Sequence, residues 1–173
     1  PVAYLRGLRT VKESVGDSFC GSFLRAAIFE EIIPTLDSPV AELNQFANDV
    51  LERFQNPFIR HELKSIALNS ISKFKVRVLP SIIEYHKRTG RLPKNLIFSF
   101  AAMIRFYKGE WRGEVLPIND SADVVKFFAD AWKCDNTDHV VKSVQANSTL
   151  WGEDITRIEG LAESVKLSLE QFR

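Results

Sequence analysis

The chain has 173 residues, 45% hydrophobic and 26% charged, a balance typical of a folded domain with its own core. Its 23 Lys and Arg against 22 Asp and Glu leave a net charge of +1. That near-neutral balance excludes the strongly basic surface of a nucleic-acid-binding domain, so we expect no nucleic-acid partner. The most apolar run, residues 96–104, is about half of the ~20 residues that a membrane span needs; it predicts a buried core helix and no membrane association.

The two cysteines, Cys20 and Cys134, lie far apart in the sequence and match no metal-ligand spacing. They predict two reduced, buried thiols, as is usual in a cytoplasmic protein, and we expect that location for this chain. The first residues show no basic stretch followed by an apolar one, so they do not resemble a secretory signal peptide. The chain opens at Pro1 without a Met, as a chain that begins within a longer protein does.

The periodicity of the first half of the chain is helical. Asp17 or Ser18 can cap a helix that continues to Pro34. Ser38 and Pro39 then predict the cap and the first-turn proline of a second helix. Spacings of three and four place the apolar stripe of this second helix at Leu43, Phe46, Val50 and Phe54.

A third helix is expected from Asn56 and Pro57, since Asn caps and Pro fits the first turn. Its apolar positions are Ile59, Leu63, Ile66, Ala67 and Ser70. Pro80 lacks a backbone N–H donor, so we expect a kink or break within residues 76–79. Gly90 predicts the end of the helix that follows this break.

The second half continues in the same manner. The apolar helix starts at Pro93 and ends before Gly109, and residues 110–118 are expected to form a loop. Residues 119–121 offer caps for the next helix. A polar turn over residues 135–138 precedes another helix that Asp138 can cap, and the last helical segment runs from Asp154 to Phe172. Strand alternation is nearly absent, so the predicted fold class is all-α, a single multi-helix domain.

The common catalytic and cofactor motifs do not occur. The sequence has no GxGxxG after a strand, no GxxxxGK[ST] and no HExxH. The three histidines, His61, His86 and His139, are too scattered to predict a metal site. Polar side chains are instead dense in residues 60–73, where the spacing of His61, Ser65, Asn69 and Lys73 predicts one helix face. The same spacing is also typical of an ordinary solvated face with surface lysines.

Several phrases, read together, resemble the long-chain mannitol dehydrogenase family. Residues 53–61 read RFQNPFIRH, similar to the family phrase RFxNPxI, and residues 69–74 read NSISKF, similar to its phrase DGSSK. Upstream, YLRG at residues 4–7 and EEIIPTL at residues 30–36 resemble the stretch that follows the family's catalytic motif. The likeness covers most of the chain and is densest over residues 1–109.

The resemblance implies that residues 1–173 are a helical C-terminal substrate domain, like that of mannitol dehydrogenases and 6-phosphogluconate dehydrogenase-like enzymes. It also implies an N-terminal Rossmann domain in the same polypeptide that binds NAD. Residues 56–85 resemble most the branch of the family that interconverts D-tagaturonate and D-altronate, so the implied substrate is a sugar acid. The family's lysine base and its Asn-Gly-x-His partners do not occur in this chain and would precede Pro1. No catalytic residue is therefore implied within the chain, which alone should be inactive.

The resemblance further implies substrate-binding residues in the polar segment. Lys73 stands where the family has a substrate-site lysine, and Ser72 matches the serine before it. Mannitol-type enzymes carry an arginine eight residues before that lysine, where this chain has Ser65 with Lys64 beside it. His61 stands where polyol enzymes usually have an acid, and a histidine near lysines suits the carboxylate of a sugar acid. The candidate substrate-binding residues are Lys73, Lys64, His61, Ser65 and Asn69.

Other interpretations are compatible with the sequence. A fructuronate reductase or a mannitol dehydrogenase would share the same phrases and differ only in its substrate. A non-catalytic helical interaction module would share the all-α pattern and the absence of catalytic motifs.

Overall fold

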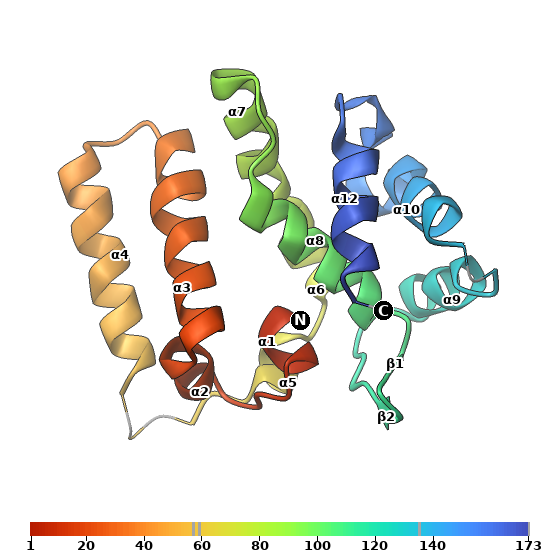
Figure 1. Cartoon of the computed structure of the whole chain (residues 1–173), viewed down its shortest axis with the longest axis horizontal. Coiled ribbons are helices and arrows are strands. Elements are labelled where there is room, and N and C mark those ends of the chain that lie inside the picture. The colour runs from red at the N-terminus through yellow and green to blue at the C-terminus, as the bar shows by residue number, and fades with distance from the viewer. Residues whose placement is uncertain (57, 59, 135, 173) are drawn as a thin grey trace.

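Helices form almost all of the regular structure in the computed structural model, which describes residues 1–56, 58, 60–134 and 136–172 (Figure 1). In chain order the helical elements are α1 (Val2–Leu5), α2 (Val11–Gly16), α3 (Ser18–Ala26), η1 (Ala27–Ile32), η2 (Ile33–Thr35), α4 (Val40–Phe54), α5 (Leu63–Ile66), α6 (Ser70–Arg77), α7 (Leu79–Thr89), α8 (Lys94–Phe106), α9 (Ala122–Ala131), α10 (Thr137–Ala146), α11 (Ser148–Trp151), η3 (Ile155–Arg157) and α12 (Leu161–Glu170). A short antiparallel hairpin of β1 (Glu110–Trp111) and β2 (Glu114–Val115) lies in the segment predicted as a loop. The all-α fold class is confirmed.

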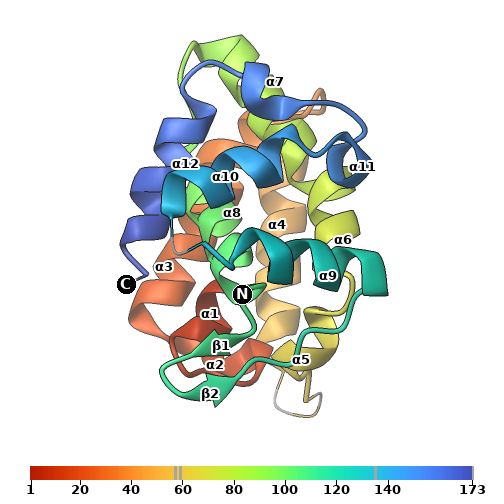
Figure 2. The same ribbon diagram turned by 90° about the vertical axis from the view of Figure 1, so that its right-hand side faces the viewer.

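The core is built around α8, the apolar run that the sequence predicted as a buried helix. In Figure 2 this helix lies behind α12 and α10, in the middle of the molecule. Phe100 has no exposed surface, and its ring packs on Phe74 of α6 and Trp151 of α11 at centroid distances of 4.8 and 5.3 Å. Burying one large apolar side chain stabilises a fold by about 1.5–3 kcal/mol, so these contacts attach α6 firmly to the core.

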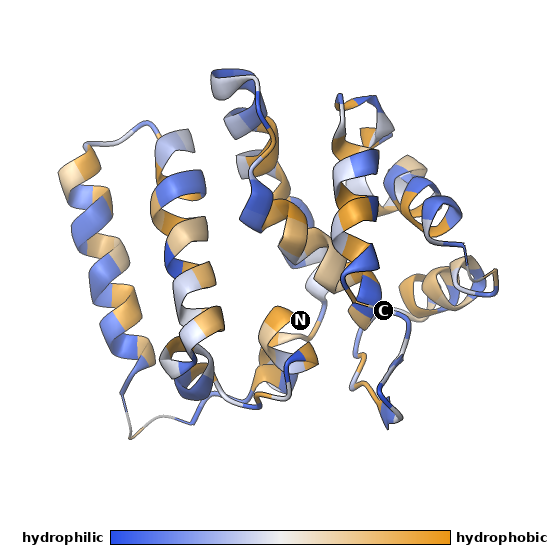
Figure 3. Ribbon diagram, viewed as in Figure 1, coloured by the Kyte–Doolittle hydropathy of each residue, from blue (hydrophilic) through white to orange (hydrophobic). Residues whose placement is uncertain are grey.

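The hairpin of α3 and α4 forms one side of the molecule, at the left of Figure 1. Asp17 caps α3 as predicted, by accepting two backbone N–H hydrogen bonds at 3.1 and 2.8 Å. The inward face of α4 carries Ala47 and Leu51, whereas Phe46 is 65% exposed, so the predicted stripe is wrong at Phe46. Hydrophilic and hydrophobic residues alternate along both helices in Figure 3, as in helices with one face towards solvent.

A buried carboxylate joins this hairpin to the core helix. Glu31, on the π-helical segment η1, is only 3% exposed. Its oxygens accept hydrogen bonds from the Asn95 backbone N–H at 2.9 Å, the Asn95 side-chain amide at 2.7 Å and the Leu96 backbone N–H at 2.9 Å. The first N–H groups of a helix have no partner within it, and a negative charge is favourable at that end. Glu31 therefore acts as the cap of α8.

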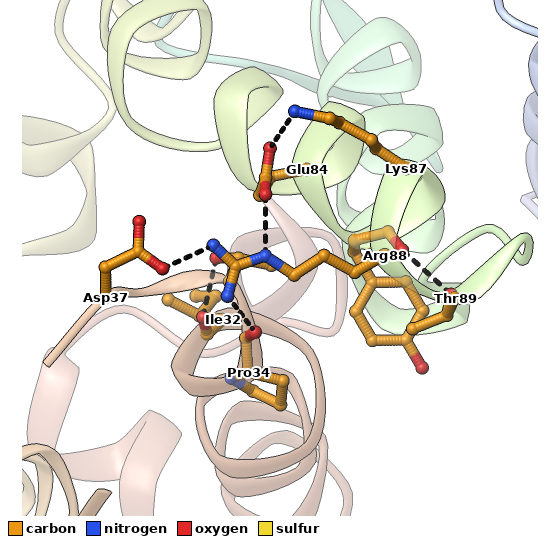
Figure 4. A network of polar contacts seen from close by, with 9 residues as sticks. Ile32, Pro34, Asp37, Glu84, Lys87, Arg88 and Thr89 are labelled. Carbon is orange, nitrogen blue, oxygen red and sulfur yellow. Dashed lines mark hydrogen bonds and ion pairs between the residues drawn. The ribbon is translucent and has the colours of Figure 1, made fainter. Parts of the chain in front are cut away.

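A polar network joins the end of α7 to the turn between η2 and α4 (Figure 4). The Arg88 guanidinium donates to the Pro34 carbonyl at 3.0 Å, to the Asp37 carboxylate at 2.7 Å and to the Glu84 carboxylate at 2.6 Å. Figure 4 shows Lys87 on the other side of the same Glu84 carboxylate. Exposed ion pairs contribute little stability, so this network mainly orients α7 against the neighbouring turn.

Two predicted boundaries are confirmed. The chain breaks at Val78, where φ is −110°, and Pro80 occupies the first turn of α7. Gly90 ends α7 in the left-handed region with φ 68°, where its N–H donates to the His86 carbonyl.

Four boundary predictions are wrong. The helix expected from Asn56 begins only at Leu63, as α5. The helix α4 starts at Val40 with Pro39 at the N-cap and has no capping side-chain hydrogen bond, so Ser38 does not cap it. The cap of α10 is Asn136, whose side chain accepts from the backbone of His139, rather than Asp138. The last helix begins only at Leu161, since the chain from Asp154 first forms η3. The predictions for Pro57, Ile59 and Asp135 concern positions outside the described residues.

Candidate functional site

The polar segment of residues 60–73 is not one helix but two short ones, α5 and α6, joined by a turn. Asn69 breaks the helix because its backbone is left-handed, with φ 51° and ψ 46°. Its N–H donates to the Asn119 carbonyl at 2.9 Å rather than to a carbonyl of the preceding turn. The prediction that His61, Ser65, Asn69 and Lys73 share one helix face is therefore wrong.

His61 lies before α5 and outside any helix. The backbone on either side of it pairs with the start of α2, since Thr10 and Glu62 form an antiparallel bridge and the Val11 N–H donates to the His61 carbonyl at 3.0 Å. This pairing uses backbone groups that a helix would need. The His61 side chain is exposed, and within the described part of the chain no hydrogen bond joins it to the other four candidates.

Lys73 has the best-defined surroundings of the five candidates. Its side chain is half-buried, and its ammonium donates to the Ile66 carbonyl at the end of α5 at 2.9 Å. Its backbone N–H donates to the Asn69 carbonyl at 3.2 Å, and the Ser72 hydroxyl donates to the same carbonyl at 3.1 Å. The structure thus brings Asn69, Ser72 and Lys73 together where α5 ends and α6 begins.

Lys64 and Ser65 lie on α5, and both side chains are exposed. Residues 60–73 carry three Lys and Arg against a single carboxylate, that of Glu62. This carboxylate is paired with Arg60 at 2.6 Å. The excess of positive charge therefore falls on Lys64 and Lys73, which suits an anionic group such as a carboxylate.

The candidates form an open surface rather than an enclosed pocket, since four of the five side chains are exposed. A cavity of about 700 Å³ lies beside the segment, between α2 and Arg60. Its lining residues are Leu8, Thr10, Lys12, Glu13, Gly16, Asp17 and Arg60. The lining includes none of the five candidates, so this cavity is not the predicted substrate-binding surface.

Sequence reasoning missed the residues that hold the turn in place. Tyr107, 3% exposed at the end of α8, donates its hydroxyl hydrogen bond to the Asp120 carboxylate. Asp120 directly follows Asn119, whose carbonyl accepts the Asn69 N–H at the turn before α6. Burial, followed by the hydrogen bond and charge of Asp120, raises the pKa of Tyr107, so the hydroxyl remains a donor at neutral pH.

The one sequence signal for these contacts was the run of caps at residues 119–121. Of the three, only Ser121 caps α9, by accepting from the Val124 N–H at 3.4 Å. Asn119 and Asp120 instead contact the turn before α6 and Tyr107. The sequence offers no spacing that would pair them with a turn so far upstream.

Other kinds of site find no support in the described residues. They contain no group of three or more His, Cys, Asp or Glu side chains that could hold a metal ion. Both Cys20 and Cys134 are free thiols, but only Cys20 is buried as predicted, whereas Cys134 is exposed. Within the same residues, no helix has the length and apolar character to cross a membrane.

Known proteins resemble this chain over almost its whole length. The family model for the mannitol dehydrogenase C-terminal domain matches residues 1–173. The altronate oxidoreductases of Enterobacter sp. (strain 638) and Escherichia coli O1:K1 / APEC are each 42% identical to this chain over 175 residues. These alignments cover 98% of this chain and 36% of each relative, so the chain spans about a third of the length of the curated relatives that it matches.

A solved structure has the same fold. It is the ternary complex of Pseudomonas fluorescens mannitol 2-dehydrogenase with NAD and D-mannitol, which aligns with a TM-score of 0.85 over 98% of this chain and 34% of that one. Its sequence identity of 21% supports the fold and nothing finer. With the family model matched over its whole length, this chain belongs to the mannitol dehydrogenase C-terminal domain family.

Proposed function

We propose that this chain is the substrate-binding domain of an NAD-dependent oxidoreductase that interconverts D-tagaturonate and D-altronate. The observation that carries the proposal is the 42% identity to altronate oxidoreductases over 98% of the chain. The excess positive charge of the α5–α6 segment supports a sugar acid, because a carboxylate is the group that distinguishes a sugar acid from a neutral polyol.

In this proposal the α5–α6 segment forms the wall of the site that faces the sugar. Lys73 is the main contact, since its ammonium is already directed by the Ile66 carbonyl and can donate further hydrogen bonds to a hydroxyl or carboxylate. Lys64, on the preceding helix α5, provides the second charge for the carboxylate. Asn69 and Ser65 supply neutral hydrogen bonds, and His61 borders the segment. Their shared task is orientation of the sugar.

The remaining parts of the enzyme are assigned to the rest of the polypeptide. An N-terminal Rossmann domain would bind NAD, which accepts or supplies the hydride when bound, and the catalytic lysine would lie upstream of Pro1. This chain has no dinucleotide-binding motif, so we assign no NAD contact and no hydride-transfer step to its residues. An open, one-walled site fits a domain whose partner closes the other side. We propose a cytoplasmic location for the whole enzyme.

The test compares the intact polypeptide with the 173-residue chain. We expect the intact protein to oxidise NADH with D-tagaturonate at a higher kcat/KM than with D-fructuronate or D-fructose. The 173-residue chain should show no turnover and no NAD binding by calorimetry. A preference for fructuronate or fructose would replace the substrate assignment. Lack of turnover with all three sugars would favour a non-catalytic interaction module, and stoichiometric NAD binding by the short chain would contradict the division of roles.

A further inference from the structure

The turn before α6 is held in an unfavourable backbone conformation. Asn69 is one of two non-glycine residues with positive φ in the described chain. A left-handed conformation disfavours a residue with a side chain, although Asn tolerates it better than most. Such a conformation persists only where surrounding contacts maintain it. The contacts at this turn therefore determine where α6 starts and where Lys73 points.

Those contacts come from a different part of the chain, residues 107–120. The Asn119 carbonyl accepts the Asn69 N–H at 2.9 Å. The Tyr107 hydroxyl donates to the carboxylate of the next residue, Asp120, and so holds the Asn119–Asp120 segment against the turn. The Tyr107 ring packs on Phe128 of α9 at a centroid distance of 4.6 Å, so the hydroxyl cannot follow the turn if the turn shifts. Because the Tyr107 ring is packed on the core, its hydroxyl has a fixed position, and this position restrains the turn.

Both the backbone and the side chain of Lys73 are hydrogen-bonded to carbonyls at this turn. Its backbone N–H bonds to the Asn69 carbonyl, and its ammonium bonds to the Ile66 carbonyl on the other side of the turn. A change in the conformation of Asn69 would alter both bonds. The position of the ammonium is therefore a consequence of how the turn is held.

We propose that Tyr107, with Asp120, is a positioning residue for Lys73, an inference that rests on the proposed function of the domain. In this arrangement Tyr107 maintains the conformation of the turn, the turn positions the Lys73 ammonium, and the ammonium contacts the substrate. Tyr107 does not touch the sugar in this arrangement. Removal of its hydroxyl should act on substrate binding only through Lys73.

A double-mutant cycle in the intact polypeptide tests this relation. We expect Tyr107→Phe to lower kcat/KM for D-tagaturonate by roughly 10- to 100-fold, mainly through a higher KM, because displaced binding groups lose that much. In the Lys73→Ala background the same change should cost less than about twofold, because coupled residues are not additive. Asp120→Asn keeps an acceptor for the hydroxyl and should retain more activity than Tyr107→Phe. The matched control is Tyr85→Phe on α7, which should behave as wild type.

Hydrogen exchange in the 173-residue chain tests the same proposal without any enzymatic activity. Tyr107→Phe should accelerate amide exchange at residues 69–73 by about tenfold or more and leave α8 and α12 unchanged, since local opening is separate from global unfolding. Tyr85→Phe should change neither region. If the intact protein reduces none of the sugars, the proposed function fails while this exchange result still decides whether Tyr107 holds the turn. Unchanged exchange at residues 69–73, or additive effects of Tyr107→Phe and Lys73→Ala, would overturn the proposal.

Discussion

Replacement of Glu31 by Ala should strongly destabilise the domain. The carboxylate is 3% exposed and accepts three hydrogen bonds, two of them from the backbone N–H groups of Asn95 and Leu96. A buried N–H left without a partner costs about 1–3 kcal/mol, and two are left here. The favourable charge at the start of α8 is lost as well, worth about 0.3–2 kcal/mol. Together these terms predict a loss of about 2–8 kcal/mol in the free energy of unfolding.

Glu31→Gln should lose less, about 1–2 kcal/mol, because the amide oxygen still accepts while the amide nitrogen faces the Leu96 N–H. The assay is urea unfolding of the 173-residue chain followed by circular dichroism, together with thermal melts. For a chain of this size the melting temperature of the Ala variant should be at least about 4 °C lower. Glu30→Ala, at the exposed neighbouring position, is the control and should stay within about 0.5 kcal/mol of wild type. A similarly small change for Glu31→Ala would refute the role of the carboxylate as the cap of α8.

Three further outcomes follow from individual residues. Gln145 is fully buried and its amide has no hydrogen-bond partner in the described protein, so Gln145→Met should raise the melting temperature; a lower melting temperature would contradict this. Between pH 10 and 11 the unfolded chain loses the Tyr107 phenol proton that the folded chain retains. Stability to urea should therefore fall with rising pH by at most about 1.4 kcal/mol per pH unit, and this part of the slope should be absent in Tyr107→Phe. Lys64→Ala in the intact enzyme should reduce the preference for D-tagaturonate over D-fructose; an unchanged ratio of kcat/KM values would remove Lys64 from the carboxylate site.

Local signals in the sequence were sufficient for much of the fold. The cap Asp17, the break before Pro80 and the left-handed Gly90 are all where the sequence predicts them. Each depends on the chemistry of a few adjacent residues, namely a carboxylate that accepts N–H groups, a missing donor and a missing Cβ. The exposed Phe46 shows the limit of this reasoning, because an amphipathic stripe does not reveal how much of its width a neighbour covers.

The arrangement of the candidate site depended on contacts that no local pattern contains. Periodicity continues through Asn69, yet its N–H bonds to Asn119, far along the chain, and the helix is interrupted there. His61 is likewise drawn into an extended bridge beside Thr10. The roles proposed for the five candidate residues remain predictions, and the predicted common helix face does not exist. Lys73 is the candidate whose surroundings make its position most definite.

The central claim is that the α5–α6 segment binds the sugar through Lys73, and one measurement tests it most directly. Lys73→Ala in the intact polypeptide should lower kcat/KM for D-tagaturonate by one to three decades, or about 1.4–4 kcal/mol, as expected for a lost charged contact. It should impair D-fructose reduction as well, since Lys73 is proposed to hold hydroxyls, and the melting temperature should stay close to wild type. Lys75→Ala on the same helix is the matched control and should leave kcat/KM unchanged. Wild-type kinetics for Lys73→Ala together with a shifted melting temperature would instead make Lys73 a structural residue and contradict the account.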